Sequence, residues 1–303
     1  MVMSPESTAG RPPRMALPQF WDLSKLQPST GSLPHNQTWS IRASEFVVRL
    51  VLSSAREEFV RRGQLEEYMV VASTPESRVT IVSEAGEERV SGRAVIVVPP
   101  GDSRVTVEAD SQVVWLFGSR AGDEMDGAQN AWFYRKHGDE TSASRAWPAP
   151  STGYALRVYQ VDDYPKDERR LGRIFQSTIG MVNFFYPEEG PRDDTALTPH
   201  AHEDFDQCTI HLQGDYVHHV RSPWSPRLAD WLPDEHRWLS SPGVVVIPAQ
   251  CVHTSQAVHE GVHQLIDFFS PPRRDWASQS GWVLNADDYS TVDHSASGVR
   301  RDS

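Results

Sequence analysis

Short apolar runs separated by turn signals recur in two blocks of the chain and predict two β-rich domains. In the first block the runs are Phe46–Val51, Tyr68–Ala72, Val79–Val82, Ala94–Val98, Val105–Val107 and Val113–Phe117. In the second block they are Ala155–Tyr159, Gly180–Phe185, Cys208–Leu212, Tyr216–Val220, Val244–Ile247, Thr254–Val258 and Gln264–Phe269. Short strands at regular spacing are typical of a β-sandwich or a β-barrel.

The segments between and beside these blocks set the predicted domain boundaries. Residues 39–118 form the first predicted domain and residues 151–289 the second. Residues 119–150, which carry Gly, Asp, Ser and Pro with few periodic apolar positions, are interpreted as the connection. The polar ends, residues 1–14 and 290–303, are expected to be disordered or flexible.

Two segments interrupt the strand pattern. Arg56–Gln64 is highly charged and is interpreted as one or two helical turns. Arg221–Pro242 is an insert that carries three tryptophans among three internal prolines, so it cannot form a continuous helix. The insert is either a lid or aromatic wall near the site, or a segment that packs outside the barrel or at a subunit interface.

Composition narrows the class of protein. The chain has 303 residues and a formal net charge of −12, with 29 basic and 41 acidic side chains. This balance disfavours nucleic acid and anionic membranes as partners, and no apolar run is long enough to span a bilayer. The N-terminus lacks the apolar region of a secretory signal, and two cysteines are too few for a disulfide framework. We therefore expect a cytoplasmic protein.

Three histidines in two segments form a pattern typical of a metal site. His200 and His202 stand at alternate positions of an extended segment, so their side chains point the same way. His253 follows the β-branched run Gly243–Pro248. Imidazoles converging from two strands predict one divalent transition metal ion per chain, and Gln207 can add a fourth ligand through its amide oxygen.

The spacing of these residues resembles the two motifs of the cupin superfamily. His200 and His202 match the first two ligand positions of the first motif, while Pro248 and His253 keep the spacing of the second. The resemblance implies an all-β fold made of two tandem cupin-type β-barrels of the jelly-roll kind, with short helices. Three other motif positions differ, and the residues found there are Asp194, Gln250 and Ala257.

The identity of the fourth ligand has two interpretations. Counted back from the turn at Gly214, the resemblance places Gln207 where the family usually has glutamate. The offset from His202 to Gln207 is odd, so a straight strand would instead put Asp206 on the histidine face. Gln207 is the ligand only if residues 203–205 turn the chain, and this is the alternative we prefer.

The first domain repeats part of the second motif without its ligands. The stretch Gly92–Arg104 has the same proline and glycine turn, but Arg104 stands at the histidine position. No His-x-His pair precedes it, and a guanidinium has no lone pair to give to a metal. We therefore expect the N-terminal barrel to be metal-free.

Further residues are assigned provisional roles around the metal. His211 shares the face of Gln207 and is the candidate general base, acting from beside the ligands. Asp267 is a candidate for orienting a ligand imidazole, and Tyr216 and His218 alternate toward the same interior. Four other histidines are interpreted as surface residues: His219, His236, His259 and His263.

These observations lead to three functional hypotheses. The first is a mononuclear non-haem metal enzyme, most simply an Fe(II) dioxygenase acting on a small enolic or aromatic molecule, with Ni, Mn, Co and Zn as alternative metals. The second is a metal-dependent isomerase or lyase. The third is a non-enzymatic bicupin that binds a small molecule. A homodimer is compatible with each.

Overall fold

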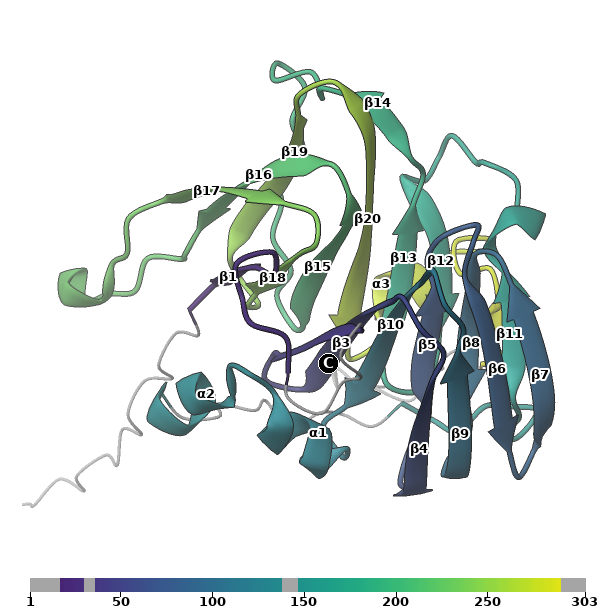
Figure 1. The fold of residues 1–303 in the computed structure, drawn as a ribbon. Helices are drawn as coiled ribbons and strands as arrows, with labels where there is room; N and C mark the ends of the chain where they lie inside the picture. The colour runs from purple at the N-terminus through teal and green to yellow at the C-terminus, as the bar shows by residue number, and fades with distance from the viewer. Residues whose placement is uncertain (1–16, 30–35, 138–146, 290–303) are drawn as a thin grey trace, which may run out of the picture.

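The chain folds into two β-barrels (Figure 1), and buried apolar side chains of both form one large cluster. The computed structural model describes residues 17–29, 36–137 and 147–289. The predicted disordered ends, residues 1–14 and 290–303, lie outside these ranges. All paired strands are antiparallel, which suits sheets with one face on a core and the other toward solvent.

The N-terminal barrel consists of two sheets. The larger has the order β11 (Arg157–Gln160), β8 (Ala94–Val98), β5 (Tyr68–Ala72), β10 (Ser111–Gly118), β3 (Phe46–Ser53) and β2 (Gln37–Arg42). The outer sheet has the order β4 (Glu57–Gln64), β9 (Gly101–Val107), β6 (Arg78–Ser83) and β7 (Gly86–Ser91). Valine, isoleucine and aromatic side chains from both sheets fill the space between them.

The C-terminal barrel repeats this arrangement. Its larger sheet has the order β1 (Gln19–Asp22), β18 (Gly243–Ile247), β15 (Asp206–Gln213), β20 (Gly261–Ser270), β13 (Met181–Phe185) and β12 (Gly172–Gln176), and β14 (Glu188–Gly190) pairs with β20. The outer sheet has the order β17 (Glu235–Ser240), β16 (Asp215–Arg221) and β19 (Val252–Val258).

Helices are short and lie in the connections. The α-helices are α1 (Gly122–Gly127), α2 (Ala131–His137) and α3 (Arg274–Ala277). Single turns of 3₁₀-helix occur at η1 (Val161–Asp163), η2 (Leu228–Asp230) and η3 (Ala286–Asp288). The first two α-helices fall within the predicted connection, residues 119–150, as far as the structure describes it.

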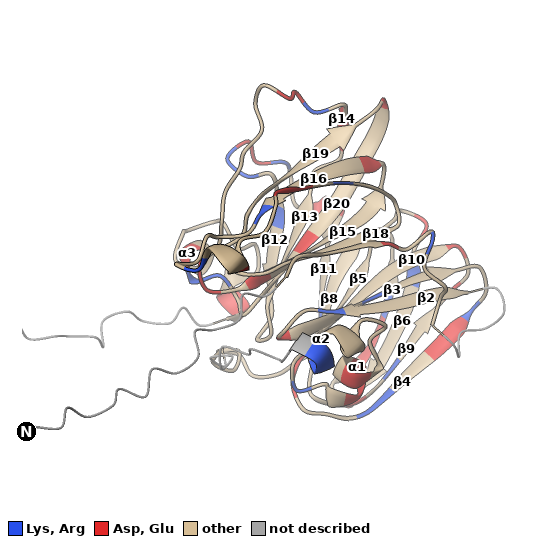
Figure 2. Cartoon of the chain, turned by 90° about the vertical axis from the view of Figure 1, so that its left-hand side faces the viewer, with Lys and Arg blue, Asp and Glu red and all other residues tan. Residues whose placement is uncertain are grey.

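The two large sheets pack face to face, and this contact holds the barrels together. A single apolar cluster contains buried side chains from both of them. Phe46 of β3 meets Phe268 of β20 edge-on, with ring centroids 4.9 Å apart. Charged residues occur within the outer strand β4, on helices α1 and α2 and in loops (Figure 2).

Each barrel also takes one strand from the other half of the chain. β1 precedes the N-terminal barrel in sequence but pairs with β18, and β11 follows the connection but pairs with β8. The predicted boundaries, 39–118 and 151–289, did not anticipate this exchange. Short strands carry no sequence signal for the sheet that they join, because pairing is decided by contacts distant in sequence.

Most predicted strands are confirmed, and β5 and β8 have the bounds expected from their apolar runs. The helical interpretation of Arg56–Gln64 is wrong, because this segment forms β4. Its less exposed positions alternate with more exposed ones, and Phe59 packs on Trp115 with centroids 4.9 Å apart. A strand that faces water on one side can carry many charges.

Candidate metal centre

Backbone pairing brings the three histidines together at one end of the C-terminal barrel. His200 and His253 form an antiparallel bridge, in which each backbone N–H donates to the other residue's carbonyl, at 3.1 and 2.8 Å. The backbone N–H of Gln250 donates to the carbonyl of His202. One potential ligand atom from each histidine lies within 4.8 Å of the other two. Among the described residues, this is the one such histidine, cysteine or carboxylate cluster.

The ring hydrogen bonds fix which nitrogens can bind a metal. Nδ1 of His200 lies 2.9 Å from the carbonyl of Thr198, and Nδ1 of His253 lies 2.9 Å from the carbonyl of Cys251. A carbonyl only accepts, so each Nδ1 carries the proton and each Nε2 keeps a free lone pair. Burial lowers the pKa of His253 to about 4, so its ring is neutral near pH 7.

His202 is buried among aromatic side chains. Its ring stacks on Phe205, with centroids 4.4 Å apart, and meets Phe269 edge-on. Burial, followed by the positive charge of Arg273, lowers the pKa of His202 to about 3. The rings of His202 and His253 are therefore suited to giving lone pairs rather than to carrying charge.

Gln207 completes the cluster, and Asp206 faces elsewhere. Oε1 of Gln207 lies 3.0 Å from Nε2 of His202 and 3.2 Å from Nε2 of His253. The carboxylate of Asp206 accepts from the backbone N–H groups of Ala249 and Ser44. The backbone bends at Glu203 and Asp204 before β15 begins, which supplies the turn that the Gln207 alternative requires.

A chain of hydrogen bonds holds the Gln207 amide in this orientation. Nε2 of Gln207 donates to Oγ1 of Thr209 at 3.0 Å, and that hydroxyl donates to Oδ1 of Asp267 at 2.5 Å. Burial raises the pKa of Asp267 to about 7. Asp267 therefore orients the amide through Thr209, whereas the sequence suggested that it would orient an imidazole.

These contacts fit a bound cation. The amide oxygen of Gln207 faces Nε2 of His253, and both atoms are acceptors when the His253 proton is on Nδ1. Two lone pairs that face each other at 3.2 Å repel unless a positive charge lies between them. A divalent metal ion supplies that charge, and nitrogen with oxygen ligands suits a first-row transition metal.

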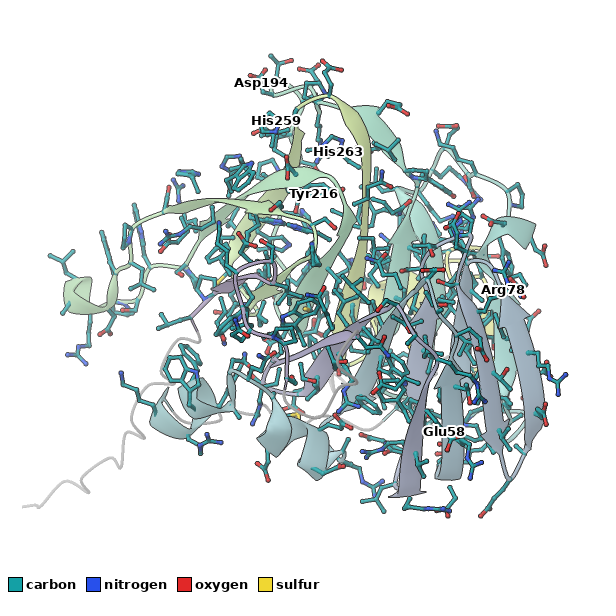
Figure 3. The ribbon with its side chains drawn as sticks, viewed as in Figure 1. Glu58, Arg78, Asp194, Tyr216, His259 and His263 are labelled. Carbon is teal, nitrogen blue, oxygen red and sulfur yellow. The ribbon has the colours of Figure 1, made fainter. Side chains whose placement is uncertain are left out.

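A small cavity of about 110 Å³ opens beside the cluster. His200, His253 and Gln207 form part of its wall, together with polar and apolar side chains from β13, β16, β19 and β20. Tyr216 and His263 also line it, and Figure 3 shows both near the end of the barrel that carries Asp194 and His259. A cavity of this size is well below the volume of sites that hold drug-sized ligands.

His211 does not line this cavity. Its ring is fully buried, its Nε2 lies 2.6 Å from Nε2 of His218, and it stacks against that ring. Burial lowers the pKa of His211 to about 4. His218 in turn places Nδ1 3.1 Å from the hydroxyl of Ser255, which does line the cavity. A base role for His211 stays a prediction, but one without direct access to a substrate.

Two cavity residues were missed or misplaced by the sequence analysis. His263 is not a surface residue: it is 3% exposed, and its ring nitrogens contact the carbonyls of Gly261 and Val258. Pairing of β14 with β20 covers it, which its polar sequence neighbours did not reveal. Arg192 lies in a loop with no motif, so no sequence signal marked it.

The N-terminal barrel has a different pair at the equivalent place. Tyr68 pairs with Val98 in the same way as Gln207 pairs with Ile247. Val98 and Ile247 each directly precede the proline of the turn. The hydroxyl of Tyr68 lies 2.9 Å from that of Ser103, and burial raises the pKa of Tyr68 to about 12.

Arg104, predicted to stand at the histidine position, instead faces outward. Its side chain is half exposed and pairs with Glu58 at 3.4 Å. The neighbouring Ser103 is instead the residue of β9 whose side chain is buried beside Tyr68. Among the described residues of this barrel, no group of metal-binding side chains forms.

The tryptophan insert lies away from the cavity. Trp224 and Trp231 stack on each other with centroids 4.4 Å apart and are 66% and 40% exposed. None of the insert's three tryptophans is among the residues that line the cavity. The insert includes β17 and projects with it beyond β16, away from the barrel (Figure 1). The geometry does not support the lid; a subunit interface stays a prediction.

Comparisons with known proteins identify the fold. Neither a protein-family model nor a curated protein sequence matches the chain. Ylba from E. coli has a TM-score of 0.52 at 11% identity, over 84% of this chain and 90% of that one. An oxalate decarboxylase variant from Bacillus subtilis also scores 0.52 at 11% identity, over 96% and 90%.

A third similar structure is a vicilin from Capsicum annuum, with a TM-score of 0.51 at 12% identity over 80% of this chain and 83% of that one. These three proteins have different names, and at such low identity the likeness concerns the fold alone. Within the described residues, no helix is long and apolar enough to cross a membrane. The chain therefore has the cupin fold, built as two tandem jelly-roll β-barrels.

Proposed function

We propose that the chain is a mononuclear metal-dependent enzyme, an Fe(II) dioxygenase that acts on a small organic molecule in the C-terminal barrel. The observation that carries this proposal is the lone-pair cluster of His200, His202, His253 and Gln207 at the wall of a cavity. When bound, Fe(II) supplies coordination positions that O₂ and a chelating substrate can occupy.

The protein's own groups would position and enclose the substrate. Tyr216 and Leu265 line the cavity beside the ligands and are nearly buried, so they exclude water from the reacting atoms. Burial also raises the pKa of Tyr216 above its usual value, so its hydroxyl stays protonated and can donate a hydrogen bond to a substrate oxygen. The ligands are all neutral, so the charge of the metal is left for an anionic or enolic substrate to balance.

A metal-dependent isomerase or lyase is the second candidate. Asp267 lines the cavity and accepts a short hydrogen bond from Thr209, which places a carboxyl group within the reaction space. A carboxyl group in such a position can exchange a proton with a substrate carbon or oxygen. This chemistry needs no oxygen, and a simple experiment separates it from the first.

The test is oxygen consumption by reconstituted protein. Metal-free protein is loaded anaerobically with Fe(II), Mn(II), Co(II), Ni(II) or Zn(II) and mixed with small enols, β-diketones and catechols. We expect O₂ uptake that matches product formation with Fe(II), and none in a His200→Ala/His253→Ala control. Turnover without oxygen supports the second candidate instead. Absence of turnover under both conditions favours the non-enzymatic hypothesis and contradicts our proposal.

A further inference from the structure

Arg192 is a cation at the cavity wall without an acidic partner. One Nη1–H donates to the carbonyl of Ser255 at 2.9 Å, and Nη2 donates to the hydroxyl of Thr198 at 3.0 Å. A longer contact joins Nη2 to the carbonyl of Ala196. In the described part of the chain, no carboxylate comes within ion-pair distance of this guanidinium, and Nε has no acceptor.

The absence of a partner is not explained by a shortage of carboxylates. The chain has 41 acidic residues against 29 basic ones, and Asp193 and Asp194 follow Arg192 directly. Asp193 is engaged with Thr195, whose backbone N–H and hydroxyl donate to its carboxylate at 2.8 and 2.6 Å. Asp193 therefore does not neutralise Arg192, and the charge of the guanidinium remains available at the cavity wall.

Thr198 couples the guanidinium to the candidate metal ligands. Its hydroxyl accepts from Arg192, and its carbonyl accepts from Nδ1 of His200. Thr198, Ser255 and Arg192 all line the cavity that His200 and His253 also line. One residue thus fixes a positive charge and a ligand imidazole on the same wall, so an anion held by Arg192 lies next to the histidine cluster.

We propose that this cavity binds a small monocarboxylic acid and that Arg192 recognises its carboxylate. The planar guanidinium fork matches a carboxylate and has N–H groups left to donate. A second carboxylate on the ligand is disfavoured, because Glu188 and Asp267 also line the cavity. The volume of about 110 Å³ and the apolar wall that includes Leu265 restrict the ligand to a few heavy atoms.

This inference deepens the proposed function and depends on it in one respect: the acid would be the substrate, with an oxo or enol oxygen directed at the histidines. Recognition by Arg192 itself is a binding event that needs no turnover. It can therefore be measured on protein loaded with redox-inactive zinc, apart from any reaction.

The test is calorimetric titration of the zinc-loaded protein with pyruvate, 2-oxobutanoate and acetoacetate, with pyruvamide as the neutral counterpart. We expect at least one acid to bind, and pyruvamide to bind much more weakly. Arg192→Gln should lower the acid's affinity by about 10-fold to 100-fold, the range for hydrogen bonds to a charged group. Arg192→Lys should fall between, because an ammonium lacks the fork. Arg221→Gln on the outer face of the same barrel is the matched control and should bind like the wild type.

Three results would overturn the inference. The first is that none of the three acids binds. The second is that pyruvate and pyruvamide bind equally well. The third is that Arg192→Gln unfolds at the same temperature as the wild type and binds the acid with unchanged affinity. If the acid binds through Arg192 but no metal supports turnover, the carboxylate site stands and the enzymatic proposal fails. If turnover occurs on a neutral substrate and is unaffected in Arg192→Gln, the enzymatic proposal stands and the carboxylate site fails.

Discussion

Replacing Thr209 by valine should weaken metal binding although Thr209 is not a ligand. The hydroxyl accepts from Nε2 of Gln207 and donates to Oδ1 of Asp267, and Thr209 is fully buried. Valine has a similar shape but cannot do either. The amide of Gln207 is then free to turn its NH₂ group toward the Nε2 atoms, where it satisfies their lone pairs in the metal-free protein and blocks the metal.

The size of the effect follows from the groups left without partners. Loss of the hydroxyl removes an acceptor from a buried amide and a donor from a buried carboxyl group, and an unsatisfied buried group costs about 1–3 kcal/mol. Removal of residues that orient metal ligands lowers metal affinity by about 10-fold to 100-fold. We expect a loss in that range for Thr209→Val, with a lower free energy of unfolding in the metal-free protein.

Thr254→Val provides the matched control. Thr254 is also buried, lies next to His253, and its hydroxyl has no hydrogen-bond partner among the described residues. Its replacement should leave zinc affinity unchanged. The assay is competition for zinc with a chromophoric chelator, together with urea unfolding of both metal-free variants. If Thr209→Val binds zinc as tightly as Thr254→Val, the hydrogen-bond chain does not orient the ligand and the reasoning is wrong.

Three further predictions concern the metal, the pH dependence and one strained residue. Wild-type protein should bind one transition metal ion per chain by elemental analysis, and a His200→Ala/His253→Ala variant almost none; a second equivalent that survives would contradict a metal-free N-terminal barrel. Burial lowers the pKa of His211 to about 4 and also depresses that of His218, so the unfolded chain binds more protons below its own pKa of about 6.5. The free energy of unfolding that this pair contributes is fully present above that pH. It declines as the pH falls toward 4, by up to about 1.4 kcal/mol per pH unit per histidine. Urea unfolding at a series of pH values should show a weaker dependence of the free energy of unfolding on pH in His211→Phe/His218→Leu than in the wild type. Gln250 has φ of 70° where the family motif has glycine, so Gln250→Gly should raise the free energy of unfolding by up to about 1 kcal/mol, and a loss of stability would refute this.

The histidine cluster was predictable because its members are close in sequence or follow a clear strand. His200 and His202 needed only the alternation of an extended chain, and the β-branched run ending at Ile247 placed His253 at a strand end. The choice between Gln207 and Asp206 was not accessible to the same rule. It depends on the bend at residues 203–204, because every side chain after the bend points to the face opposite to the one that straight alternation predicts.

The residues that the sequence did not reveal depend on long-range pairing. β14 covers His263, and the loop that carries Arg192 runs beside β19, where the Arg192 N–H donates to the carbonyl of Ala257. β4 was misinterpreted because its charges suggested a solvated helix, and because both of its faces carry charged residues, so no apolar and polar alternation is visible in the sequence. The local sequence pattern predicts a strand or a helix, but the strands that pair with it decide which of its side chains line the cavity.

The Gln207→Glu substitution tests how the candidate ligand at position 207 is coupled to the hydrogen-bond chain through Thr209 and Asp267. A carboxylate should hold a divalent ion more tightly than an amide, since it offsets positive charge. The structure adds a condition: the Thr209 hydroxyl has one proton, which it already donates to Asp267. A carboxylate at position 207 would place a second acceptor against that hydroxyl, so one of the two carboxyl groups must hold a proton in the metal-free variant. Metal binding would then release it.

At pH 8 the wild type should release fewer protons on binding zinc than Gln207→Glu. The burial that raises the pKa of Asp267 to about 7 leaves that group mostly ionised at this pH in the wild type. Calorimetry in two buffers of different ionisation enthalpy measures the difference directly. A Gln207→Glu/Asp267→Asn variant removes one of the competing carboxyl groups and should return proton release toward the wild-type value. Equal proton release by the wild type and the single variant would show that position 207 and Asp267 do not share the Thr209 hydroxyl, and the proposed support of the ligand would fail with it.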